Sequence, residues 1–174
     1  KTKNTHTTDP SEITDLECIF SGVQLLGGFD NFVRLQSLRL MNTGLVRISR
    51  LEPLGATLTH LTLSAQLIDT IPPLPLPNIR ELYLHDNRIL KIEGLSQCVR
   101  LEKLWLCSNR IRKIGGLESQ GSLRELWLQG NLISSIESGV LKHNPNLEIL
   151  AMGKNNIANL KDVSRLVSNL PLLH

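Results

Sequence analysis

The residues best placed to do chemistry are three aromatic side chains at a fixed interval. Tyr83, Trp105 and Trp127 are 22 residues apart and include the only tyrosine and both tryptophans of the sequence. Each lies between two leucines, and in an extended strand such a residue points away from the side that buries its neighbours. Aromatic rings that face outward in a row are typical of anchors for a binding partner. We therefore predict a partner-binding surface built on these three rings.

Charged and polar residues flank the aromatic residues at two further positions. The position two residues before each ring is occupied by Glu81, Lys103 and Glu125, and the position two residues after it by His85, Cys107 and Gln129. Mixed charge around aromatic anchors suits a peptide or a helix better than a phosphate backbone. We expect Glu81, Lys103, Glu125 and His85 to set the register and specificity of a protein partner.

Catalysis and metal binding find little support in the sequence. His85 and Cys107 fall on adjacent repeats and could form a thiolate–imidazole pair or part of a metal site, but no third ligand follows at metal spacing and no oxyanion donor is evident. The motifs of phosphate loops, dinucleotide sites, serine hydrolases and zinc proteases are missing. We therefore expect no enzyme, no catalytic residue, no metal or cofactor and no small-molecule substrate.

The aromatic residues belong to a repeat that extends over most of the chain. Six units begin at Leu35, Leu58, Ile79, Leu101, Leu123 and Leu147, at steps of 23, 21, 22, 22 and 24 residues. Each fits the pattern L-x-x-L-x-L-x-x-N-x-I-x-x-I-x-x-L, most clearly over residues 101–117. A period of 20–29 residues with this pattern indicates a leucine-rich-repeat solenoid.

The pattern predicts the fold as an α/β repeat solenoid. Each leucine–x–leucine segment forms a short strand, and neighbouring units pair in parallel into a concave sheet of a right-handed arc, with short turns or 3-10 helices on the convex side. The asparagine of each unit is expected to bond backbone groups where the chain leaves the sheet; these residues are Asn87, Asn109, Asn131 and Asn155. Thr43 and Gln66 replace it in the first two units, whose turns we expect to be less regular.

The domain organisation follows from the repeat. We expect residues 1–34 to form a tail and a capping helix, residues 35–165 the six repeats, and residues 166–174 the start of a truncated seventh repeat. Asp9, Pro10 and Glu12 resemble a helix start, which places the helix near residues 10–20. Its apolar face would cover the first repeat and consists of Ile13, Leu16, Ile19 and Phe20.

Composition and charge exclude several classes of protein. With 35 leucines and 14 isoleucines in 174 residues the chain is not disordered, and no apolar run approaches the roughly 18 residues that cross a bilayer. The net charge is +3, with an excess of basic residues in the second half: Arg88, Lys91, Arg100, Lys103, Arg110, Arg112 and Lys113. We interpret this cluster as a solvated face, with an acidic partner or nucleic acid as the alternative.

The sequence indicates an intracellular protein. It has three widely spaced cysteines, no Asn-x-Ser/Thr acceptor and no signal peptide at Lys1.

The 22-residue period and residues 92–95 and 114–117 also resemble the short class of intracellular leucine-rich repeats. That class includes a regulatory subunit of protein phosphatase 1, tubulin-folding cofactor E, the spliceosomal A-prime protein and the axonemal dynein light chain. Residues 58–71, 79–95 and 101–117 resemble the amino-terminal repeats of a long leucine-rich-repeat protein of cilia.

The resemblance implies a scaffold of a ciliary or cytoskeletal assembly that binds a protein partner on its concave face. It favours the cilium, flagellum or cytoskeleton over the nucleus or the cytosol. Two alternatives remain open, a regulatory subunit of a phosphatase and an RNA- or ribonucleoprotein-associated module. The second would use the basic residues Arg88, Arg110, Arg112 and Lys113.

Overall fold

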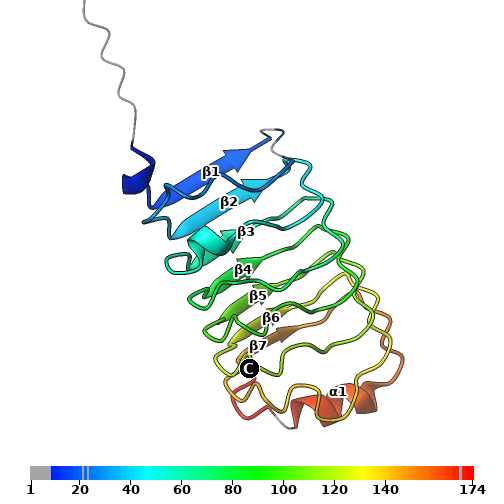
Figure 1. Cartoon of the computed structure of the whole chain (residues 1–174). Helices are drawn as coiled ribbons and strands as arrows, with labels where there is room; N and C mark the ends of the chain where they lie inside the picture. The colour runs from blue at the N-terminus through cyan, green and yellow to red at the C-terminus, as the bar shows by residue number, and fades with distance from the viewer. Residues whose placement is uncertain (1–8, 21, 23, 169) are drawn as a thin grey trace, which may run out of the picture.

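The computed structural model describes residues 9–20, 22, 24–168 and 170–174. Among them, seven strands form one parallel sheet in which the strands lie in sequence order (Figure 1). The strands are β1 (Asp15–Ile19), β2 (Ser37–Met41), β3 (His60–Thr62), β4 (Glu81–Tyr83), β5 (Lys103–Trp105), β6 (Glu125–Trp127) and β7 (Ile149–Ala151). The predicted solenoid with a parallel concave sheet is confirmed.

Strand pairing keeps equivalent residues of the repeats side by side. Leu82 pairs with Leu104 and Leu104 with Leu126, so the leucines at the middle of the strands form one column on the core side. Tyr83, Trp105 and Trp127 pair in the same register. Because successive side chains of a strand point to opposite faces, this second column lies on the concave face of the sheet, which is turned away from the core.

The core is built from the aliphatic positions of the repeat. In the first five units every inward position holds a side chain that is at most 9% exposed. In the last unit Leu150, Met152 and Ile157 are only partly buried, and Leu160 is 80% exposed. No described unit covers the outer side of this last layer, which explains its incomplete burial.

The segments that return from the end of one strand to the start of the next are mostly turns and extended chain. The 3-10 helix η2 (Glu52–Leu54) and the helix α1 (Leu160–Val167) are the helical exceptions between residues 24 and 168. Asn159 caps α1, because its side chain accepts a hydrogen bond from the backbone N of Lys161 at 3.0 Å. At the end of the chain, the backbone N of His174 donates to the carbonyl of Glu148 at 3.0 Å.

The capping helix expected near residues 10–20 is wrong. Asp9 does cap a helical turn, and its pKa lies below the usual value because its carboxylate accepts a hydrogen bond from Ser11. The helix, η1 (Pro10–Glu12), ends after three residues and the chain continues as β1. The free edge of β2 offers backbone partners to this segment, and the backbone N atoms of Gln36 and Ser37 both donate to the carbonyl of Thr14.

Burial in β1 follows the period of a strand. Leu16 and Cys18 are partly buried against the core, whereas Ile19 is 45% and Phe20 75% exposed. The apolar residues that we assigned to one helical face therefore point to different sides. The end of the core is covered by an added strand instead of a helix.

The asparagines act as predicted. The side chain of Asn109 accepts a hydrogen bond from the backbone N of Ile89 at 2.9 Å and donates to the carbonyls of Leu84 and Leu106, both at 3.0 Å. Equivalent bonds are made by Asn87, Asn131 and Asn155. Gln66 forms the same kind of bonds, to the backbone N of Leu45 and the carbonyl of Leu40, so the expectation of a less regular turn is wrong at this position.

Candidate protein-binding face

The three aromatic residues form a continuous column on the concave face of the sheet, on strands β4, β5 and β6. The ring centroids of Tyr83 and Trp105 lie 5.2 Å apart, and those of Trp105 and Trp127 lie 4.9 Å apart. The first pair is T-shaped, with 68° between the ring planes, and the second is tilted by 36°. All three side chains are half-buried, because each ring covers part of its neighbour. The column is therefore preorganised by aromatic contacts.

A row of alternating charges lies beside the aromatic column. Lys103 Nζ is 3.3 Å from a carboxylate oxygen of Glu81 and 3.7 Å from one of Glu125, so one lysine bridges two glutamates on the neighbouring strands. His60 extends the row to β3, with its Nε2 3.8 Å from Glu81. His60 occupies the same strand position as Glu81, and the repeat alignment alone could have identified it.

Hydrogen bonds join the two columns at their ends but not at the centre. The hydroxyl of Tyr83 donates to Glu81 at 2.6 Å, and Nε1 of Trp127 donates to Glu125 at 3.1 Å. The buried Nε1 of Trp105 has no hydrogen-bond partner within the described residues. The reason is in the sequence: the residue two positions before Trp105 is Lys103, which offers no acceptor.

The charged row shifts the pKa values of its members. Burial raises the pKa of Glu81, but the hydrogen bonds from Tyr83 and Lys103 outweigh this effect and hold the pKa below its usual value. The hydrogen bond to Glu81 and the two nearby carboxylates raise the pKa of Lys103. Burial and the hydrogen bond to Glu81 raise the pKa of the Tyr83 hydroxyl. At neutral pH Glu81 is therefore ionised, and both Lys103 and Tyr83 are protonated.

His85 lies at the edge of the aromatic column, and Cys107 follows it on the next unit. The ring centroid of His85 is 6.2 Å from that of Trp105, and its Nδ1 lies 3.0 Å from the hydroxyl of Ser64. The thiol of Cys107 donates to Oε1 of Gln129 at 3.1 Å, and burial raises its pKa. These bonds engage Nδ1 of His85 and the thiol of Cys107 separately, and a raised pKa of the thiol disfavours the thiolate that a nucleophile requires. Among the residues that the structure describes, no three potential ligands lie close enough to hold a metal ion.

The basic residues of the second half do not form one surface. Lys103 belongs to the charged row on the sheet, and Lys113 pairs with Glu137 at 2.9 Å on the return segments. Arg88, Arg110 and Arg112 are exposed and form no ion pair within the described residues. The sequence did not show that Glu81, Glu125 and Glu137 neutralise part of the basic cluster.

Comparison with known proteins supports the repeat assignment. A family model described as leucine-rich repeats, in two copies, matches residues 77–119. No curated protein matches the sequence. No helix in the described part of the chain is long and apolar enough to cross a bilayer.

Solved structures share the fold. An internalin, inlF, from Listeria monocytogenes is 23% identical, with a TM-score of 0.71 over 84% of this chain and 42% of that one. A leucine-rich-repeat protein of Leptospira interrogans is 24% identical, with a TM-score of 0.73 over 87% of this chain and 39% of that one. TLR13 in its complex with ssRNA13 is 23% identical, with a TM-score of 0.71 over 90% of this chain and 22% of that one.

This chain spans less than half the length of each of these three proteins. At such low identity the likeness establishes the fold and no specific activity. The arc of parallel strands and the asparagine turns agree with it. The chain is therefore a solenoid with the leucine-rich-repeat fold, a fold that generally serves protein–protein interaction.

Proposed function

We propose that this chain is a non-enzymatic module that binds a protein partner on its concave face. The observation that carries the proposal is the column of rings in contact, Tyr83, Trp105 and Trp127, on the side of the sheet opposite the core. Core packing gives no reason for aromatic residues at these positions, since the leucines of the same strands already fill the core. Half-buried aromatic rings that are held by their neighbours lose little conformational entropy on binding.

The charged row gives the surface its selectivity. Glu81, Lys103 and Glu125 place a positive charge between two negative ones along the column, a pattern that a peptide or helix with the complementary order would match. The buried Nε1 of Trp105 leaves the ring face of this residue, and not its N–H group, as the surface that a partner would contact. The ring centroid of His85 lies 6.2 Å from that of Trp105, so His85 would contact the same part of the partner.

The cellular setting is also part of the proposal. The resemblance of residues 58–71, 79–95 and 101–117 to the amino-terminal repeats of leucine-rich-repeat-containing protein nine supports a ciliary or cytoskeletal assembly. Imaging of the tagged full-length protein in ciliated cells tests it, and a uniformly cytosolic or nuclear signal would contradict it.

The binding proposal is tested by quantitative capture from an extract of ciliated cells. Trp105→Ala and Trp127→Ala should each weaken the binding of a specifically captured partner by about 2 kcal/mol, the usual scale for an aromatic anchor. Thr62→Ala, in the same outward column on β3, is the matched control and should leave capture unchanged. Urea unfolding of each variant separates loss of binding from loss of folding.

The nucleic-acid alternative predicts a different result. If a partner is retained by both tryptophan variants but lost on replacement of Arg110, Arg112 and Lys113 by alanine, the concave-face proposal is wrong. A steep linear fall of log affinity with log salt would then identify phosphate contacts. The likeness to TLR13, solved with ssRNA13, makes this comparison worth including.

A further inference from the structure

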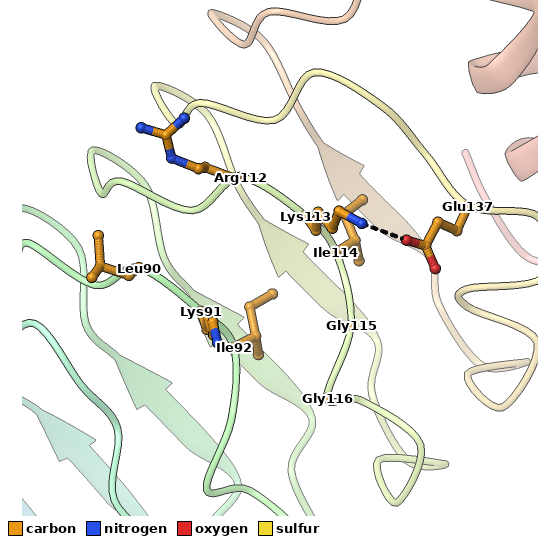
Figure 2. Close-up of a pocket in the computed structure, with 9 residues that line it drawn as sticks. All are labelled: Leu90, Lys91, Ile92, Arg112, Lys113, Ile114, Gly115, Gly116 and Glu137. Atoms are coloured by element: carbon orange, nitrogen blue, oxygen red, sulfur yellow. Dashed lines mark hydrogen bonds and ion pairs between the residues drawn. The ribbon is translucent and has the colours of Figure 1, made fainter.

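A groove on the return segments is separate from the concave face. It has a volume of about 590 Å³ and lies between the third, fourth and fifth units, on the stretches that follow their asparagine turns (Figure 2). Its floor contains Leu90, Ile92, Ile114 and the backbone of Gly115 and Gly116. Leu90 is 52% exposed although it is apolar. None of the residues lining this groove belongs to the sheet.

The groove is open because one unit lacks a side chain that its neighbours have. Alignment of the repeats places Gly115 at the position of Glu93 in the unit before and of Glu137 in the unit after. A Cβ atom built on Gly115 would meet nothing within 4 Å, so the space above this residue is empty. Gly116 differs, because its own Cβ would lie 2.1 Å from the carbonyl oxygen of Ile92. Packing therefore requires glycine at 116 but not at 115.

The glycine at position 115 also leaves the positive charge of Lys91 without an ion-pair partner. Lys113 Nζ lies 2.9 Å from Glu137 Oε1, an ion pair between one unit and the next that Figure 2 shows beside the groove. One unit earlier the equivalent positions are Lys91 and Gly115, and glycine has no carboxylate to offer. Lys91 and Arg112 both line the groove, and neither forms an ion pair within the described part of the chain.

We propose that this groove binds an acidic peptide segment of a partner protein. A glutamate or aspartate of the peptide enters over Gly115 and pairs with Lys91, as Glu137 pairs with Lys113 one unit later. An aliphatic side chain next to that carboxylate packs on the exposed side chain of Leu90. The exposed side chain of Leu90 favours a peptide over nucleic acid, since a phosphate backbone would leave this apolar surface uncovered. This inference uses none of the residues of the concave face and does not depend on that proposal.

Selection from a random peptide library on phage identifies the ligand chemistry. The library is selected on the immobilised chain, and phage that also bind the Gly115→Glu variant are removed. This variant restores the missing carboxylate, and its own side chain occupies the space over residue 115. We expect the enriched peptides to carry aspartate or glutamate next to leucine, isoleucine or valine. An enrichment of basic peptides, or no enrichment over Gly115→Glu, would overturn the proposal.

Affinity measurements with the most enriched peptide, synthesised with a fluorescent label, test the site. Gly115→Glu and Lys91→Ala should each weaken binding at least about tenfold, because the first occupies the site and the second removes the cation. Gly121→Glu adds the same charge at an exposed glycine that an added Cβ would not crowd, and its affinity should stay within about twofold of the unmodified chain.

Two further results would count against the groove. Equal affinity of the unmodified chain and Gly115→Glu for the peptide would place the binding site elsewhere. Binding of single-stranded polyuridylate that is lost in Lys91→Ala, with no peptide selected, would assign the groove to nucleic acid. Lys91 is exposed, so its replacement by alanine tests the charge in a chain that keeps its fold.

Discussion

At the scale of single residues, the tryptophan at the centre of the concave face makes close aromatic contacts but leaves one hydrogen-bond donor unpaired. Trp105 packs against both Tyr83 and Trp127, yet its indole N–H is buried and has no acceptor among the described residues. Trp127 contacts the ring of Trp105 from the other side, and its indole N–H donates to Glu125. A buried donor without a partner lowers the stability of the folded state, so the two tryptophans should respond differently to the loss of the N–H group.

We therefore predict different effects of Trp105→Phe and Trp127→Phe on the free energy of unfolding. Both changes remove the same ring area, but only Trp127→Phe removes a hydrogen bond to a carboxylate. Trp127→Phe should be the more destabilising of the two by about 1 kcal/mol. Urea unfolding followed by circular dichroism measures the difference. Equal losses would show that the bond to Glu125 contributes nothing in solution.

The carboxylate of Glu81 makes the stability of the sheet depend on pH. Its pKa is lowered in the folded state from the usual value of 4.5, so its contribution is present above that value and is lost as the pH falls through the lower folded value. The free energy of unfolding should fall between about pH 6 and about pH 3, and Glu81→Gln should make that fall smaller.

The control for this prediction is Glu93→Gln, which makes the same chemical change at an exposed carboxylate without an ion pair in the described structure. Its pH dependence should match that of the unmodified chain. Urea midpoints measured across the pH range decide the matter. If Glu81→Gln and Glu93→Gln give the same curve, the bonds from Tyr83 and Lys103 do not stabilise the ionised form.

At the scale of the element, two adjacent glycines in one turn have opposite requirements. Gly116 has a φ of +67°, and an added Cβ would collide with the carbonyl oxygen of Ile92. Gly115 has open space instead. Gly116→Ala should therefore destabilise the chain by about 2 kcal/mol or more, whereas Gly115→Ala should change stability by less than about 1 kcal/mol. Thermal unfolding compares the two variants, and a similar loss in both would contradict the assigned roles.

The elements also show how far the sequence could predict the structure. The strands and the asparagine turns follow from the repeat because each is specified by residues within one unit. The segment around Leu16 was misread because its apolar residues fit both a helix and a strand, and the free edge of β2 decides between them. The ion pair between Lys113 and Glu137 and the gap at Gly115 depend on contacts between units. The sequence alignment shows that glycine replaces glutamate at position 115, but only the path of the return segments shows which lysine thereby loses its partner.

At the scale of the whole molecule, the two surfaces differ in charge balance. On the concave face the charges of Glu81, Lys103 and Glu125 largely compensate one another. On the return segments, Lys91 and Arg112 have no such partner in the described residues. The excess of basic residues in the second half therefore lies mainly away from the aromatic column. The solenoid can thus present two binding surfaces with different chemistry, one of them aromatic and the other apolar with a positive rim.

A solenoid also distributes its stability unevenly, because each unit contacts only the units beside it. Amides of the central strands donate to the next strand on a fully buried core, as Leu84 does to Trp105 and Leu106 to Trp127, each at 2.8 Å. At one end Ile19 of β1 is 45% exposed, and at the other end Leu150 of β7 is only partly buried. Local opening should therefore be easiest at the two edges of the described sheet, β1 and β7.

Hydrogen exchange should detect this gradient. We expect amides in β4, β5 and β6 to exchange at least about tenfold more slowly than those in β1 and β7. Leu104→Ala creates a cavity at the centre, with a cost of about 2–5 kcal/mol, and should speed exchange in several units because neighbours on both sides pack against that residue. Leu150→Ala should affect only the last unit. Uniform exchange in the unmodified chain, or a response to Leu150→Ala that reaches β4, would mean that the solenoid opens as one cooperative body.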